Sequence, residues 1–104
     1  TTTDKFKADY ASVNGGLTSL GIDAPRFIGR TSFLPFATPQ YNPAIIQAQN
    51  DIITQYTNTY AGPNTDNFPP YYAYRHDTVH FSIGGLDIVG SLWADYIRNP
   101  TKNL

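Results

Sequence analysis

Hydrophobic positions repeat with helical spacing in three separate segments of the chain. In the first segment, residues 3–20, apolar side chains recur at intervals of three and four, which places them on one face of a helix. These positions are Phe6, Tyr10, Val13, Leu17 and Leu20. Thr2 or Thr3 can cap the start, and Gly21 is a natural stop after the last periodic residue. The spacing predicts a helix over residues 3–20.

The second helical segment begins at Asn42-Pro43. Asn is a favoured N-cap, and proline is favoured at the first helical position. One face then collects Ile45, Gln49, Ile52 and Tyr56, with Ile46 and Ile53 alongside. We expect this helix to run to about Thr57.

The third helical segment follows Ser82, which can act as its N-cap. The apolar positions predict a buried face made of Ile83, Leu86, Val89 or Gly90, Trp93 and Ile97, with Leu92 beside them. Asn99-Pro100 ends the helix, because the residue before a proline is disfavoured in helical geometry.

Two short runs between the helices have the length of strands. Residues 26–30 follow the first helix, and residues 59–61 follow the second, with Gly62-Pro63-Asn64 expected to end the second strand. Strands separated by helices form a parallel sheet through crossover connections. The sequence therefore predicts an α/β fold. Since two strands are too few for a free-standing parallel sheet, the chain is expected to be part of a larger α/β domain.

Composition excludes several classes of function. Charged residues make up 14% of the 104-residue chain, the formal net charge is -1, and the basic residues are scattered. This argues against nucleic-acid and membrane-surface partners. Cysteine is absent, which excludes disulfides, thiolate catalysis and cysteine metal sites. Asn, Thr, Ser, Gln and Tyr take the place of Lys and Glu, a composition that favours a secreted or extracellular protein of bacteria or phage.

One cluster carries candidate chemistry, and it contains both histidines of the chain: His76, Asp77 and His80. Residues three apart in one turn of chain lie side by side, so the Asp77 carboxylate can accept a hydrogen bond from Nδ1–H of His80. That contact fixes the tautomer and leaves Nε2 free as a general base. The alternative is a loop carboxylate that bonds a nearby imidazole for structural reasons alone.

The segment around this pair, Arg75-His76-Asp77-Thr78-Val79-His80-Phe81-Ser82-Ile83-Gly84-Gly85 and the apolar helix after it, resembles the C-terminal block of SGNH (GDSL-type) hydrolases. The resemblance is closest to the carbohydrate esterase branch, which includes sialate O-acetylesterase-like proteins. Upstream, Pro25 to Ser32 resembles a strand and loop of that branch, Ala44 to Tyr56 its next helix, and Gly62 to Asp66 the turn after the following strand.

The resemblance implies that residues 1–104 are the C-terminal part of a three-layer α/β/α, flavodoxin-like SGNH hydrolase domain. Asp77 would orient the imidazole and His80 would be the base of a Ser-His-Asp triad. The family's Gly-Asp-Ser-like nucleophile motif is missing here. The implied partner is therefore an N-terminal SGNH half that carries the serine, as a separate chain or a removed segment.

The activity implied by the resemblance is deacylation, in particular deacetylation, of an acylated carbohydrate, without metal or cofactor. The alternative is a non-catalytic carbohydrate-binding or assembly module derived from the same fold. A further interpretation treats His76-Asp77-x-x-His80 as similar to the H-E-x-x-H zinc motif, but that motif needs a helix and this segment is expected to be a loop. We therefore expect no metal ligands, and His76 to be an exposed loop histidine.

Other conspicuous side chains have structural interpretations. Trp93 is expected to lie in the core, and Asp66 is expected to stabilise the turn that contains it. Arg30 is expected in a surface ion pair, with contact to an acidic sugar as the alternative. Tyr71, Tyr72 and Tyr74 are expected to cover the core beside the site or to form the wall of a sugar subsite.

Overall fold

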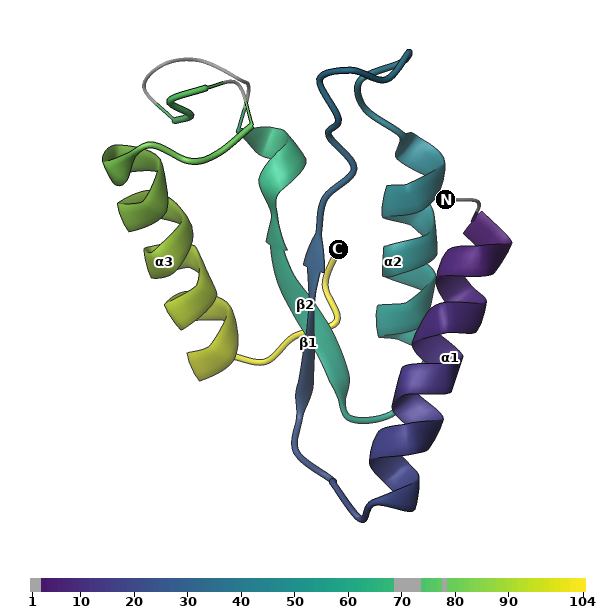
Figure 1. Cartoon of the computed structure of the whole chain (residues 1–104). Coiled ribbons are helices and arrows are strands. Elements are labelled where there is room, and N and C mark those ends of the chain that lie inside the picture. Colours follow the sequence, from purple (N-terminus) through teal and green to yellow (C-terminus); the bar gives the residue numbers. More distant parts are fainter. Residues whose placement is uncertain (1–2, 69–73, 78) are drawn as a thin grey trace.

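The sheet has two parallel strands, β1 (Arg26–Arg30) and β2 (Thr59–Asn64), in the computed structural model of the chain (Figure 1). The structure describes residues 3–68, 74–77 and 79–104. Ile28 lies opposite Ala61, and the register shifts between Ile28 and Arg30. The predicted α/β fold with a parallel sheet is confirmed.

The second strand is longer than the sequence suggested, because Gly62 and Pro63 continue it to Asn64. The N–H of Ala61 points away from β1 and donates to the Thr101 carbonyl (2.8 Å). Strand geometry places the nitrogen of Pro63, two residues later, on that same outer side. The missing proline N–H therefore costs no hydrogen bond to β1.

Helix α2 (Pro43–Gln55) covers one face of the sheet and supplies much of the core. It begins as predicted, with the Asn42 side chain accepting from the Ala44 N–H (3.1 Å), and it ends two residues before the expected Thr57. Its buried residues are Ala48, Gln49, Ile52 and Ile53. Of the predicted face, Gln49 and Ile52 are buried and Ile45 and Tyr56 are half-buried.

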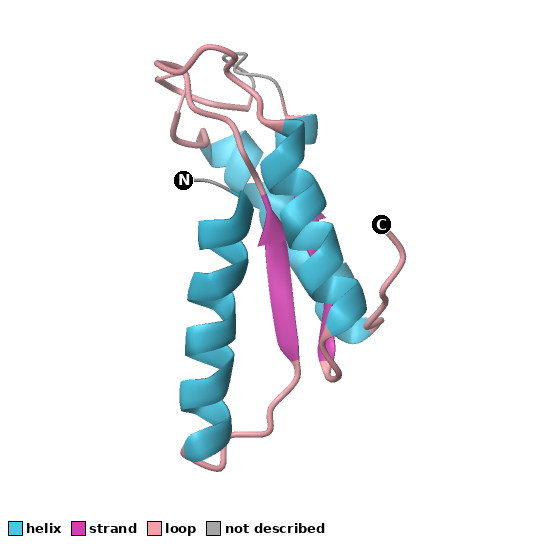
Figure 2. Cartoon of the chain, turned by 90° about the vertical axis from the view of Figure 1, so that its right-hand side faces the viewer, coloured by secondary structure: helices cyan, strands magenta, loops and turns pink. Residues whose placement is uncertain are grey.

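Helix α1 (Thr3–Ser19) packs against α2, and the two helices run side by side (Figures 1 and 2). Lys7 pairs with Asp51 of α2 at 2.7 Å, and no residue of α1 is buried. The predicted apolar face is therefore only half covered: Val13 is 60% exposed and Leu20 is 77% exposed. A helix that packs only against one other helix contacts it along a narrow strip, which explains why the apolar face of α1 is incompletely buried.

Helix α3 (Ile83–Arg98) lies on the opposite side of the sheet from α2 (Figure 1). The Trp93 ring packs on two strand glycines, since a Cβ on Gly62 would stand 2.7 Å from the ring and one on Gly29 3.1 Å from it. Trp93 therefore packs on the sheet but is half-buried, at the edge of the core in which it was expected. None of the helices in the described residues is both long and apolar enough to cross a membrane.

The predicted buried face of α3 is wrong for most of its members. Ile83, Leu86 and Ile97 are 83%, 56% and 53% exposed, and within the helix only Gly85 and Val89 are buried. The reason is geometric. Neighbouring strands are about 4.8 Å apart, whereas a helix with its side chains is about 10 Å wide. A two-stranded sheet cannot cover the whole apolar face of α3.

Candidate active site

The loop that carries the histidines leaves the C-terminal end of β2 and leads into α3. It starts with a short 3₁₀ turn, η1 (Thr65–Asn67), and reaches the helix at Ser82 (Figure 1). The loop after β1 ends up at the same end of the sheet (Figure 1). The carboxyl ends of parallel strands are where open α/β sheets place their ligand sites.

Backbone hydrogen bonds close this loop on itself. The His76 N–H donates to the His80 carbonyl (3.0 Å), and the Ser82 N–H donates to the Tyr74 carbonyl (2.8 Å). The Ser82 side chain also caps α3 as predicted, accepting from the Gly85 N–H at 3.0 Å. A Cβ on Gly85 would stand 2.1 Å from the Tyr74 oxygen, so only glycine allows the loop to sit this close to the helix.

The buried side chain of Arg75 anchors the loop. Arg75 is 7% exposed, and its guanidinium donates to the carbonyls of Val79 (2.6 Å) and Thr65 (3.3 Å). The guanidinium also stacks over Phe81 and Phe33, at 4.5 and 5.3 Å from the ring centroids. A buried cation is tolerated when carbonyls and aromatic faces satisfy it. Sequence reasoning missed this role, since nothing local distinguishes Arg75 from a surface arginine.

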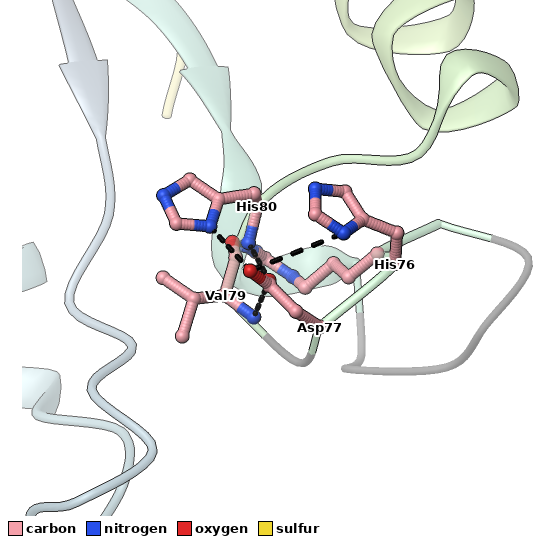
Figure 3. A network of polar contacts seen from close by, with 5 residues as sticks. His76, Asp77, Val79 and His80 are labelled. Atoms are coloured by element: carbon pink, nitrogen blue, oxygen red, sulfur yellow. Dashed lines mark hydrogen bonds and ion pairs between the residues drawn. The ribbon is translucent and has the colours of Figure 1, made fainter.

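The Asp77 carboxylate organises the loop tip with both of its oxygens (Figure 3). Oδ1 accepts from the backbone N–H groups of Val79 (3.0 Å) and His80 (2.6 Å). Oδ2 lies 2.6 Å from Nδ1 of His80. The contact predicted from the three-residue spacing is present. With Nδ1 engaged by the carboxylate, Nε2 is the nitrogen left to accept a proton.

These contacts hold the pKa of Asp77 well below its ordinary value. The largest cause is the hydrogen bond with the His80 side chain, followed by the one from the His80 backbone N–H. Both side chains are open to solvent, at 42% exposed for Asp77 and 72% for His80. The arrangement is therefore an ionised carboxylate that orients an accessible imidazole.

His76 stands on the other side of the same carboxylate. Its Nδ1 is 3.9 Å from Asp77 Oδ2, and its ring stacks on that of His80, with centroids 5.8 Å apart and planes inclined by 17°. The side chain is 58% exposed, in agreement with the interpretation of an exposed loop histidine. The described residues of this segment are not helical, so the helical geometry of the H-E-x-x-H motif is not formed.

No serine hydroxyl within the described residues is hydrogen-bonded to His80. Ser32 donates from Oγ to Asp66 Oδ2 (2.5 Å) and accepts from the Asn42 N–H (2.8 Å), so it holds the loop after β1. Asp66 was expected to stabilise its own turn, and that expectation is wrong. The Asn64 side chain does this by accepting from the Asp66 N–H (3.0 Å), which leaves the Asp66 carboxylate to bind Ser32.

Arg30 is also corrected by the structure. It is 5% exposed and donates twice to the Gly62 carbonyl, from Nε at 3.2 Å and Nη2 at 3.0 Å. It therefore braces β1 against β2, and within the described residues it forms a buried contact with a carbonyl in place of the expected surface ion pair. The pleat explains the difference, since the side chain turns inward where the register shifts at the end of β1.

An open hollow borders His76 at the start of α3, and neither residue of the Asp77–His80 dyad lines it. It is lined by His76, Phe81, Ser82, Ile83, Gly84 and Leu86. A second hollow of about 360 Å³ lies between α1, the loop after β1 and α2, and neither Asp77 nor His80 lines it. Tyr74 packs on Phe68, with ring centroids 5.7 Å apart, whereas Tyr71 and Tyr72 lie outside the described residues.

Comparison of the chain with models of protein families, with curated proteins and with solved structures finds no match. The resemblance to SGNH hydrolases therefore rests on the sequence around Asp77 and His80 and on the pattern of the upstream segments. Its implications for function are proposals.

Proposed function

We propose that this chain supplies the Asp and His of a Ser-His-Asp triad in an SGNH-type serine esterase. The observation that carries the proposal is the 2.6 Å contact between Asp77 Oδ2 and His80 Nδ1 on a loop at the carboxyl end of the sheet. The carboxylate selects the tautomer with the proton on Nδ1, so Nε2 can take a proton from a serine hydroxyl. General-base assistance of this kind is worth roughly 10²–10⁴ in rate.

The nucleophile in this proposal comes from a segment with a Gly-Asp-Ser-like turn, in a preceding part of the polypeptide or in a partner chain. Two features support such a segment. Among the described residues β1 pairs with β2 alone, so its other edge is open for a further strand. The exposed side chains of Ile83, Leu86 and Ile97 leave apolar surface on α3. A completed sheet would give the three-layer SGNH architecture.

The proposed reaction is removal of an acyl group, in particular acetyl, from a carbohydrate. In the acylation step, serine Oγ attacks the ester carbonyl while His80 Nε2 takes the hydroxyl proton and then passes it to the departing sugar oxygen. In the second step water attacks the acyl-serine carbonyl while His80 Nε2 takes a proton from the water; the acyl–Oγ bond then breaks, His80 returns the proton to serine Oγ, and the carboxylic acid leaves. Neither step requires a metal or a cofactor. The composition adds support for a secreted or extracellular location of the enzyme.

The test combines the chain with the segment encoded immediately upstream of it and measures hydrolysis of p-nitrophenyl acetate and of acetylated sugars. We expect the chain alone to be no faster than free imidazole, and the combination to turn over and to be blocked by a serine-directed reagent. Robust, serine-reagent-sensitive turnover by the 104-residue chain alone would contradict the half-site proposal. A combination that binds acetylated sugars without hydrolysing them would favour the non-catalytic module instead.

A further inference from the structure

The side chains of His76, Asp77 and His80 converge more closely than a catalytic dyad requires. One potential ligand atom from each lies within 4.8 Å of the other two. Figure 3 shows Nδ1 of both rings directed at the Asp77 carboxylate from two sides, at 3.9 Å for His76 and 2.6 Å for His80. A Ser-His-Asp triad makes no use of His76, so its position calls for another explanation.

We propose that His76, Asp77 and His80 form a binding site for Zn²⁺, with Nδ1 of each histidine and Oδ2 of the aspartate as ligands. Two imidazoles and one carboxylate are a ligand set that favours zinc over magnesium or calcium. Three protein ligands leave the fourth tetrahedral position for water. The site goes beyond the proposed esterase function and does not depend on it.

The spacing of the ligand atoms is close to what zinc needs. Bond lengths of about 2.0–2.1 Å in a tetrahedral site imply ligand atoms about 3.3 Å apart. The observed separations of 2.6 and 3.9 Å from Asp77 Oδ2 bracket that value. The two imidazoles are 58% and 72% exposed, so little besides their mutual ring contact opposes the side-chain rotations that zinc requires. Asp77 Oδ1 stays with the backbone N–H groups of Val79 and His80 and keeps the carboxylate in place.

The rest of the chain offers zinc no comparable site. His76 and His80 are its only histidines, and it contains neither cysteine nor glutamate. Strong zinc binding by this chain must therefore use the loop tip. When zinc binds the lone pair of His80 Nδ1, the single N–H proton of the neutral ring moves through solvent from Nδ1 to Nε2. Nε2 then carries that proton and can no longer accept one. Zinc would switch His80 out of the role that the proposed function gives it.

The experiment is isothermal titration of the whole chain with ZnCl₂, and with MgCl₂ as the hard-cation control. We expect saturable binding of one zinc, and affinity about tenfold weaker or worse in His76→Ala and in His80→Ala. Asp95→Asn removes an exposed carboxylate at the other end of α3 and should leave zinc affinity unchanged. Circular dichroism of each variant reports whether the helices are retained.

Imidazole ¹⁵N resonances provide a second measurement that involves no enzymatic activity. Zinc should shift Nδ1 of both rings and leave His80 with its proton on Nε2. The proposal is overturned if the unaltered chain shows no saturable zinc binding, or if the folded His76→Ala variant binds zinc as tightly. Equal affinity for magnesium would overturn it as well, because it would mean that the carboxylate charge alone attracts the cation and that the imidazoles are not ligands.

Discussion

The two sides of the sheet differ in how completely they are covered. On one side, α2 buries Ala48, Ile52 and Ile53 against the strands. The C-terminal tail closes the end of this helix, because Lys102 Nζ donates to the carbonyls of Ile53 (2.5 Å) and Tyr56 (2.8 Å). A cation on the last carbonyls of a helix satisfies groups that have no partner within the helix.

The other side of the sheet, formed by α3 and the loop that leads into it, is much less buried. Within α3 only Gly85 and Val89 are buried, and the chemistry-bearing side chains of Asp77 and His80 stand in solvent. The comparison teaches that the stability of this molecule is concentrated on the α2 side, and its candidate chemistry on the α3 side. Substitutions on the two sides should therefore have separable effects.

The largest expected effect is on activity and comes from the α3 side. In the combination with the serine-bearing segment, His80→Ala should lower kcat for p-nitrophenyl acetate by about 10³ or more, because the general base is lost. His76→Ala is the matched control and should cost under about tenfold in zinc-free buffer. Both imidazoles are exposed, so neither variant should lower the urea midpoint by more than the loss of one solvent-exposed side-chain contact. Equal activity losses in the two variants would refute the assignment of His80 as the base.

The next effect is on stability and separates the two sides directly. Ile53→Ala on α2 should lower the free energy of unfolding by about 2–5 kcal/mol, because it opens a cavity at a fully buried position. Ile97→Ala on α3 makes the same chemical change at a position that is 53% exposed, and should cost under about 1 kcal/mol. Urea unfolding followed by circular dichroism measures both. A comparable loss from Ile97→Ala would show that the α3 face is covered in solution.

Arg75 connects the loop to the rest of the molecule, so its removal should affect both the activity and the stability. Arg75→Met keeps the volume but loses the charge-assisted bonds to Val79 and Thr65, at a cost of about 1–3 kcal/mol. Arg98→Met removes an exposed guanidinium that pairs with Asp95, and should cost under about 1 kcal/mol. Thermal unfolding compares the two variants. If both are equally mild, Arg75 does not anchor the loop.

The smallest effect tests the dyad contact itself. The pKa of Asp77, followed through its side-chain ¹³C resonance, should lie below the ordinary value of 3.8, because the His80 hydrogen bond favours the ionised form. A lowered pKa means that ionised Asp77 stabilises the fold above pH 3.8, and that this contribution is lost as the pH falls further toward the native-state pKa. His80→Ala should raise the pKa toward 3.8. An unchanged pKa in that variant would mean that the 2.6 Å contact does not persist in solution.

The local signals in the sequence were sufficient for the elements and for the dyad contact. Asn42 and Ser82 cap their helices as their chemistry predicts, and both strands begin where the pattern placed them. The contact between Asp77 and His80 followed from their spacing of three residues. All of these depend on atoms within a few residues of one another, so nearest-neighbour geometry determines them.

Tertiary structure decided everything that joins distant segments. Arg30 and Asp66 are charged side chains whose partners, a carbonyl and a hydroxyl, lie 32 and 34 residues away along the chain, so no local pattern distinguished them from surface residues. The exposure of Ile83 and Ile97 depends on the width of the sheet beneath α3, which helical periodicity does not report. Likewise, local pattern predicted an exposed His76 but not the position of its ring beside that of His80. The folded loop brings the two imidazoles to one carboxylate by closing its backbone between His76 and His80.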